Sequence, residues 1–336
     1  MLEKPNIPDE HINACLRETY GLDVAQLTFL SLGADVNTAV YRADTGDGKR
    51  YFVKLRSGVF DEMTIIVPKL LHDQGIQQVI APLPTQSGQL WTSLENFKLA
   101  VFPFVEGSNG YEIELTDQHW VEFGRALKAI HSAAILPAIT SRIQRESFSS
   151  QWRESVKDFQ RQAVETIFGD PVAAELAAFL RRQQAVINHL VQRATDLAAA
   201  LQSQSPSFIL CHADIHAGNV LIDANDHFYI VDWDTLIMAP VERDLMYVGG
   251  GQFLDTRSPE EEAALFYQGY GPAQTDSVAL AYYRYERIVQ DIAAYCEEIL
   301  ITSGDSADRA NGLRQLMSQF EPNNVVEITF RSERTK

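Results

Sequence analysis

The sequence predicts an α+β fold with two lobes, a small antiparallel sheet followed by a larger, mostly helical lobe. Up to residue 103, short β-prone runs alternate with turn signals such as Asp44–Arg50, which is the pattern of strands and hairpins. After residue 107, apolar residues recur at helical spacing over long stretches. We therefore expect an N-terminal lobe at residues 1–103, a hinge at 104–107 and a helical lobe at 108–336. Within the helical lobe, we expect a helical insertion at 150–201.

Composition bounds the kind of partner and compartment. The chain has 336 residues, with 28 basic and 45 acidic residues and a net charge of −17. This charge argues against a nucleic-acid or anionic-membrane surface; it fits a cationic partner, or solubility alone. Three widely spaced cysteines without a C-x-x-C indicate a reducing compartment. With no signal-peptide pattern and no apolar run approaching ~20 residues, we expect a cytoplasmic protein, with a monomer favoured.

The segment Ser207–Asp234 combines strand-like runs with a cluster of polar side chains. Phe208–Cys211, Val220–Ile222 and Phe228–Val231 are short β-prone runs, and a turn-rich stretch between the last two predicts a hairpin. A polar turn follows the first run, and Asp232-Trp233-Asp234 follows the last. We expect the carboxylates and the amide of this segment to point to one place.

The spacing of these polar residues predicts phosphoryl transfer. Asn219 follows Asp214 by five residues and precedes Asp232 by thirteen, and His212 comes two residues before Asp214. In the kinase catalytic loop, H-x-D-x-x-x-x-N, the Asp accepts the proton of the substrate hydroxyl and the Asn holds Mg²⁺, with a second Asp completing the metal site. Mg²⁺ prefers such hard oxygen ligands. We predict Asp214 as the catalytic residue and Asn219 and Asp232 as magnesium ligands; a polar turn beside a buried hairpin is the alternative.

Several segments resemble the aminoglycoside phosphotransferase family, which has a protein-kinase-like fold. The motifs H-A-D-I-H-A-G-N and I-V-D-W-D carry this resemblance, and it runs over nearly the whole chain. Outer segments such as L-L-H-D-Q-G-I and R-D-L-M-Y-V-G-G-G resemble the branch of the family that phosphorylates spectinomycin. The resemblance implies MgATP-dependent transfer to a hydroxyl of a small cationic aminocyclitol, with spectinomycin as first choice and antibiotic resistance as the result. The expected partners are this small molecule and the nucleotide.

In a kinase-like fold, the hairpin around Gly33–Thr38 covers the nucleotide phosphates. Its single glycine makes a weak motif by itself, and a plain hairpin turn is the alternative reading. Within the resemblance, backbone N–H groups are candidate phosphate contacts. The side chains of Ser31, Asn37 and Thr38 are further candidates.

Lys54 lies on one face of an alternating strand and occupies the position of the kinase lysine that pairs with the α- and β-phosphates. An exposed edge-strand lysine is the alternative. The helix expected over Phe60–His72 contains one glutamate, Glu62, which either holds Lys54 or is a favourable charge at the helix N-terminus. Phe102–Gly107 resembles the interlobe hinge. There, backbone groups near Pro103 and Val105 are expected to bind adenine.

Five residues are assigned further roles in or beside the catalytic turn, the segment His212–Asn219. Asp234 and Trp233 are expected to point to the same mouth and to contact metal or acceptor. Glu286, on a helix expected over Ser277–Thr302, either faces a cationic substrate or lies on a solvated helix face. The resemblance implies that Asp244 bonds the backbone of the catalytic turn and that His212 helps to hold it.

Two other functions share parts of this pattern. A metabolic kinase for an amino alcohol or sugar derivative would have the same core residues. A catalytically silent kinase-like binding protein would be expected to lack one of four residues that are all present here, Lys54, Asp214, Asn219 and Asp232.

Overall fold

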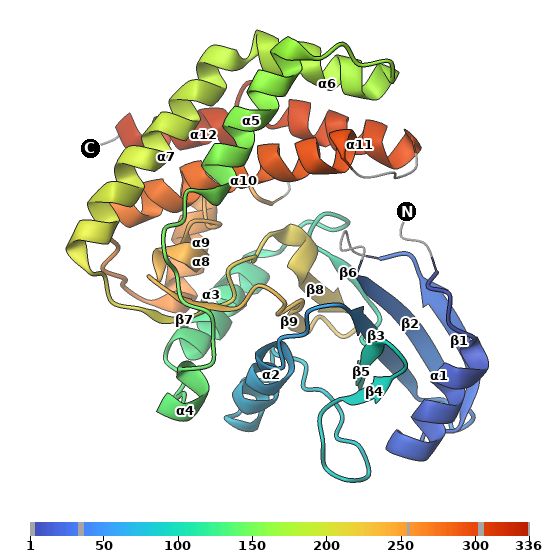
Figure 1. The fold of residues 1–336 in the computed structure, drawn as a ribbon. Coiled ribbons are helices and arrows are strands. Elements are labelled where there is room, and N and C mark those ends of the chain that lie inside the picture. Colours follow the sequence, from blue (N-terminus) through green and yellow to red (C-terminus); the bar gives the residue numbers. More distant parts are fainter. Residues whose placement is uncertain (1–3, 33–36, 254–255, 302–305, 335–336) are drawn as a thin grey trace. The chain divides into compact units, whose positions relative to one another are not determined.

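The computed structural model describes residues 4–32, 37–253, 256–301 and 306–334. The chain divides into two compact units. The first contains Met1–Ile113, Ser132–Ile143 and Gly218–Leu236. The second contains Glu114–His131, Gln144–Ala217 and Ile237–Lys336. The α+β class is confirmed (Figure 1). The boundaries expected at residues 103 and 107 stay predictions. None of the described helices has the length and apolar character needed to span a membrane.

The first unit is built on a five-stranded antiparallel sheet in the order β1-β2-β3-β5-β4. The short helix α4 comes from a later part of the chain than the other helices of this unit. The elements of this unit are α1 (Asp9–Cys15), the π-helical turn η1 (Leu16–Tyr20), α2 (Met63–Asp73), α4 (Pro137–Thr140), β1 (Val24–Leu30), β2 (Thr38–Thr45), β3 (Arg50–Ser57), β4 (Thr92–Leu94), β5 (Phe97–Pro103), β6 (Gly107–Asn109), β8 (Val220–Asp223) and β9 (Phe228–Ile230).

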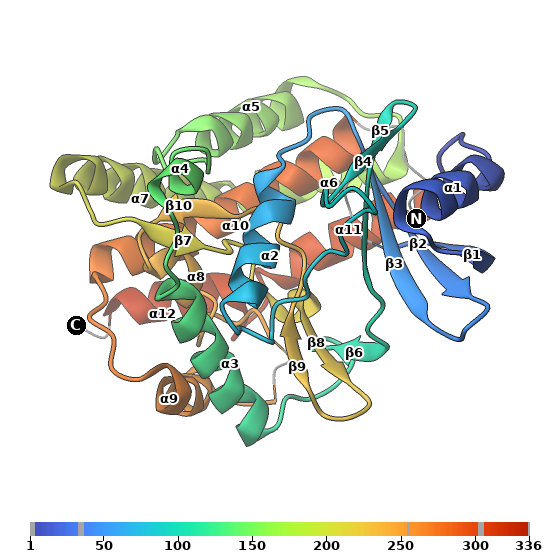
Figure 2. The same cartoon turned by 90° about the horizontal axis from the view of Figure 1, so that it is seen from below.

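The faces of β3 are used differently. Val53 and Leu55 are fully buried in a cluster that includes Ile12 and Leu16 from α1 and η1. Figure 2 shows α1 beside the sheet. Because successive side chains of a strand point to opposite faces, Lys54 lies on the face away from this cluster. The sheet therefore buries an apolar layer on one side and presents a cationic side chain on the other.

The first unit contains a second sheet of three strands. Two of these strands, β8 and β9, follow the catalytic turn along the chain. The strand order of this sheet is β6-β8-β9, and Val79 forms a parallel bridge with Ile230 of β9. One strand precedes the helices expected after residue 107, because Gly107–Asn109 pairs with Leu221–Asp223. A Cβ on Gly107 would meet the carbonyl oxygen of Ile222 at 2.3 Å, so this close pairing requires glycine.

The second unit is mostly helical. It contains a two-stranded antiparallel sheet. The 3-10 turn η2 (Ala217–Asn219) begins at Ala217 of this unit and continues with Gly218 and Asn219, which belong to the first unit. The other elements of the second unit are α3 (Asp117–His131), α5 (Gln151–Glu165), α6 (Pro171–Arg182), α7 (Gln184–Gln204), β7 (Ile209–Cys211), β10 (Ile237–Ala239), α8 (Glu242–Leu245), α9 (Pro259–Tyr270), α10 (Ser277–Leu300), α11 (Ser306–Ser318) and α12 (Val325–Arg334).

Helix α10 is the centre of this unit and packs against α5, α7, α8, α11 and α12 (Figure 1). The single long helix expected over Pro171–Leu201 is instead two helices, because Gln183 leaves helical geometry (ψ 9°) and ends α6. No glycine or proline lies at this break, so only packing reveals it. Asp170 caps α6 by accepting a hydrogen bond from Ala173.

Helices α3 and α9 approach so closely that their contact depends on glycine. A Cβ built on Gly269 would lie 1.8 Å from the carbonyl oxygen of Val121, and one on Gly124 would lie 2.1 Å from that of Phe266. Since backbone atoms cannot move aside as a flexible side chain can, either alanine would push the helices apart.

We predict that Gly269→Ala lowers the free energy of unfolding by about 2–3 kcal/mol, since overpacking shifts the backbone of two helices. Urea titration followed by circular dichroism measures this loss. Gly169→Ala is the matched control, because a Cβ there meets nothing within 4 Å. Equal stabilities for the two variants would contradict the predicted clash.

Candidate active site

In the first unit, Lys54 forms ion pairs with two aspartates that follow β9. Its Nζ lies 2.7 Å from Oδ2 of Asp234 and 3.4 Å from Oδ1 of Asp232. Burial by itself lowers the pKa of Lys54, but the two carboxylates outweigh it and leave the pKa above its usual value. Lys54 is therefore cationic at neutral pH, and the structure excludes the alternative of an unpaired, exposed lysine.

Asp232 and Trp233 form the turn that carries this carboxylate pair. Asp232 adopts a left-handed backbone (φ 61°), a strained conformation that non-glycine residues keep where the surroundings enforce it. Trp233 is buried, and its Nε1 donates to the carbonyl oxygen of Ile230 at 3.2 Å. Its indole thus anchors the turn, while half of the Asp232 side chain stays exposed.

Glu62 does not contact Lys54 in this structure. Its carboxylate pairs with Arg142, and both side chains are exposed. The acid at the other end of α2, Asp73, pairs with Lys69 one turn earlier. The ion pairs of Lys54 thus come from Asp234 and Asp232, in the turn after β9.

The predicted phosphate contacts are only partly described. Gly33–Val36 lies outside the described residues. Ser31 and Asn37 are exposed at the flanks of that stretch, and the hydroxyl of Thr38 accepts a hydrogen bond from Arg56 at 2.8 Å. Arg56 also lies 3.6 Å from Asp234. Two cations of one strand, Lys54 and Arg56, therefore gather where an anionic ligand is expected.

At the predicted hinge, Pro103 is the last residue of β5 and pairs with Tyr51. Pro103 is exposed and Val105 is half-buried. Their contact with adenine stays a prediction.

In the second unit, Asp214 lies in a buried hydrogen-bonded network. Its Oδ1 binds the guanidinium of Arg287 and lies 3.2 Å from the hydroxyl of Tyr247, and its Oδ2 lies 3.6 Å from Nε2 of His216. Tyr247 is fully buried, and its hydroxyl also lies 2.9 Å from the carbonyl oxygen of Ala213. The carboxylate is thus fixed from three sides.

These contacts set the ionisation of Asp214. Burial would raise the pKa of its carboxyl, but the charge of Arg287, with smaller contributions from His216 and His212, lowers the pKa to about 2. Burial also lowers the pKa of His216 below its usual value. At neutral pH, Asp214 is therefore an anion that accepts hydrogen bonds, beside a neutral His216.

Asp244 holds the backbone of the turn that contains Asp214. Its carboxylate is fully buried and accepts hydrogen bonds from the backbone N–H groups of His212 (2.9 Å) and Ala213 (2.6 Å). Ala213 has a left-handed backbone (φ 71°), and the N–H of Asp214 points to Nδ1 of His212 at 3.3 Å. The contact expected between Asp244 and the turn is present.

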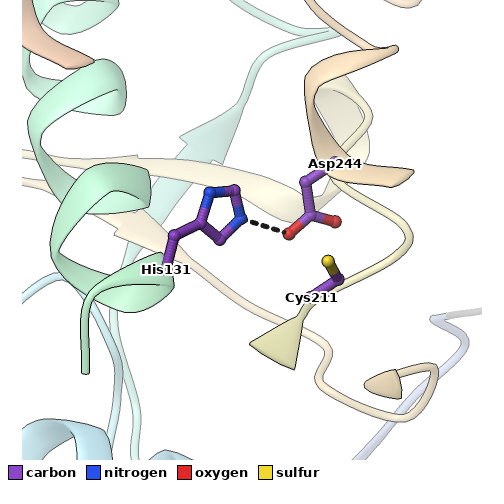
Figure 3. Close-up of side chains that lie close together, drawn as sticks. All are labelled: His131, Cys211 and Asp244. Carbon is purple, nitrogen blue, oxygen red and sulfur yellow. Dashed lines mark hydrogen bonds and ion pairs between the residues drawn. The ribbon is translucent and has the colours of Figure 1, made fainter. Parts of the chain in front are cut away.

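His131, Cys211 and Asp244 gather their ligand atoms within 4.8 Å of one another (Figure 3). His131 uses both ring nitrogens, Nε2 with Asp244 (2.9 Å) and Nδ1 with Tyr270 (2.8 Å). Burial raises the pKa of the Cys211 thiol well above its usual value, whereas metal binding requires the thiolate. We interpret this cluster as a hydrogen-bonded support for the turn.

We predict that Asp244→Asn costs about 3 kcal/mol of stability at pH 7, because an amide cannot accept all the buried hydrogen bonds. Burial raises the pKa of Asp244, but hydrogen bonds led by that from His131 hold it below its usual value. Its contribution is therefore present above the unfolded pKa of about 3.9 and is lost as pH falls toward the lower folded pKa.

Denaturant melts of parent and variant from pH 7 to pH 3 test this. The difference in unfolding free energy should shrink below about pH 4. Asp158→Asn, which removes an exposed ion pair with Arg161, is the control and should stay within about 0.5 kcal/mol. A pH-independent difference at Asp244 would contradict the assignment.

Glu286 does not lie on a solvated helix face. It is buried and pairs with Arg153 of α5 at 2.5 Å. Burial raises the pKa of Glu286 to about 7, although the charge of Arg153 opposes the rise. Glu286 therefore joins α10 to α5, and a contact with an acceptor stays a prediction.

Sequence reasoning missed Arg287 and Tyr247 as partners of Asp214. Arg287 pairs with Asp291 one turn away at 2.9 Å, as i, i+4 spacing on a helix favours. Tyr247 lies within R-D-L-M-Y-V-G-G-G, a segment that contributed to the resemblance but gave Tyr247 no role. The sequence did show Arg287 as a cation on the helix that carries Glu286. No sequence pattern connects it to Asp214, which lies 73 residues away.

The model of the "phosphotransferase enzyme family" matches residues 28–283. The chain belongs to this family, and it is a phosphotransferase with a hydroxyl group as acceptor.

Among similar solved structures is a spectinomycin phosphotransferase, APH(9)-Ia, in complex with ADP and spectinomycin. It is 37% identical, covers 98% of this chain and 99% of its own, and has a TM-score of 0.90. Its AMP-bound complex gives 36% identity over 96% and 98% of the two chains, with a TM-score of 0.85. The kinase-like fold and the resemblance to this branch are confirmed.

Protein StrN of Streptomyces griseus is 27% identical over 184 residues, or 53% of this chain. The match spans 56% of that curated relative, about half its length. A choline kinase from Streptococcus pneumoniae, 17% identical over 93% of this chain and 99% of its own with a TM-score of 0.55, shows likeness of fold alone.

Proposed function

We propose that this protein is a MgATP-dependent O-phosphotransferase whose acceptor is a hydroxyl of a cationic aminocyclitol, with spectinomycin as first choice. The observation that carries this proposal is the 37% identity, across nearly the full length of both chains, to a spectinomycin phosphotransferase. The net charge of −17 favours a cationic acceptor through long-range attraction. We further propose a cytoplasmic monomer that confers resistance to the antibiotic.

The residues of the first unit fit magnesium and a nucleotide. Lys54 and Arg56 provide cations for phosphate groups, and Asp232, Asp234 and Asn219 provide the hard oxygen atoms that Mg²⁺ prefers. We assign Asn219 and Asp232 to the metal and Lys54 to the α- and β-phosphates. When bound, Mg²⁺ would neutralise charge on the phosphates during transfer.

Asp214 is assigned to the acceptor hydroxyl. It is ionised at neutral pH, so it accepts a hydrogen bond from the hydroxyl and orients its oxygen. With a pKa of about 2 it is a weak base. It therefore takes the proton late, after the oxygen has begun to bond to phosphorus, as expected for a loose transition state.

A transfer assay with purified protein tests the proposal. MgATP is combined with spectinomycin, a panel of aminoglycosides, or amino alcohols including choline, and the phosphorylated product is identified by mass spectrometry. Product with spectinomycin and a raised inhibitory concentration in cells that express the protein would support the proposal. Product only with an endogenous alcohol would replace it with a metabolic kinase, and nucleotide binding without any product would indicate a silent binding protein.

We predict that Asp214→Ala and Asp232→Ala each reduce kcat by at least about 10³-fold, since one removes the acceptor contact and the other a metal ligand. Both side chains contact solvent in part, so circular dichroism should show folded variants. Full activity in either variant would overturn its assignment.

We predict that Asp234→Asn raises KM for ATP about 10-fold, equivalent to ~1.4 kcal/mol, because Lys54 loses its 2.7 Å partner. Glu62→Gln is the matched control and should change KM less than about twofold, since Glu62 pairs with Arg142 in an exposed contact of small energy. A larger effect at Glu62 would show that it holds Lys54 in the working enzyme.

A further inference from the structure

The buried guanidinium of Arg287 connects three groups of the second unit. Its Nη1 binds Oδ1 of Asp214 and lies 3.0 Å from the Tyr247 hydroxyl, and its Nε lies 2.9 Å from Oδ1 of Asp291. The guanidinium carbon lies 5.8 Å from the centroid of the Tyr247 ring. A planar fork with several donors can hold two carboxylates in fixed directions at once, which an ammonium cannot.

Arg287 is itself locked in place. Asp291 accepts a hydrogen bond from Gln319 at 3.0 Å on its other oxygen, and the side chains of Arg287 and Asp291 are only 17% and 14% exposed. Both residues lie on α10, the helix that packs against most others of this unit. The direction of the guanidinium is thus set by the core of the unit.

We propose that Arg287 is a positioning residue that binds Oδ1 of Asp214 and fixes the direction in which the carboxylate meets the acceptor hydroxyl. This rests on the proposed function and adds to it the residue that orients the proton acceptor. Arg287 anchors Oδ1 to α10, while Oδ2 lies 3.6 Å from Nε2 of His216. Rotation of the carboxylate would then misplace the proton acceptor, an error to which such transfers are sensitive.

Removing the guanidinium at nearly constant volume tests the proposal. Arg287→Met should lower kcat by about 100-fold while KM for ATP changes less than about twofold, because Lys54 and the metal ligands are untouched. Arg287→Lys keeps the charge without the fork and should recover part of kcat. Asp291→Asn keeps Arg287 but loosens it, and it should lower kcat by a smaller factor; it also serves if Arg287→Met does not fold.

Arg309→Met is the matched control. Arg309 is similarly buried (15% exposed) and pairs with Asp170 and the carbonyl oxygen of Ile299, away from Asp214. It should lower the melting temperature and leave kcat unchanged. Equal loss of kcat in the two variants would reduce Arg287 to a general structural role and overturn the proposal.

A measurement without substrate separates this proposal from the proposed function. The side-chain carboxyl ¹³C resonance of Asp214, assigned with Asp214→Asn, is recorded at pH 7 in the full-length protein. Arg287→Met should shift or broaden it, and Arg309→Met should not. An unchanged resonance, or a changed resonance with unchanged kcat, would overturn the proposal. A parent protein inactive on every acceptor would overturn the proposed function, while the resonance would still decide whether Arg287 fixes Asp214.

Discussion

The buried carboxylate of Asp244 is the interaction on which the catalytic turn depends. Two successive backbone N–H groups, those of His212 and Ala213, donate to this one side chain. A buried donor without an acceptor costs more than most side-chain contacts contribute. The left-handed backbone of Ala213 is kept by these bonds and directs the next residue, Asp214, to its partners.

Charge pairing organises each unit around a separate group. In the first unit, Lys54 is charged on the polar face of a sheet because Asp232 and Asp234 offset the cost of its burial. In the second, Asp214 is charged because Arg287 offsets a cost of the same kind. Two side chains of opposite charge therefore remain ionised at neutral pH, and positioned charge of this kind is what the proposed phosphoryl transfer requires.

Local sequence patterns did not predict which residues from distant parts of the chain form ion pairs with one another. Period-two alternation placed Lys54 on the face opposite the apolar core, and the spacing of Asp214 and Asn219 located the catalytic turn. The expected Glu62 contact came from helix order alone, yet Glu62 lies at the start of α2 and pairs with Arg142. A solvated helix face was one of the two readings for Glu286, but α5 covers this residue with Arg153.

The sequence by itself determined the α+β class, most of the strands and helices, and the motif that carries the chemistry. These depend on interactions within a few residues, such as alternation, turn residues and fixed spacing. Tertiary structure alone decided the break at Gln183, the strand after Gly107, and the partners of Lys54, Asp214 and Glu286. Each of these features depends on contacts with residues from a distant part of the chain. Such ion pairs and helix ends produce no local periodicity in the sequence, so the sequence pattern does not predict them.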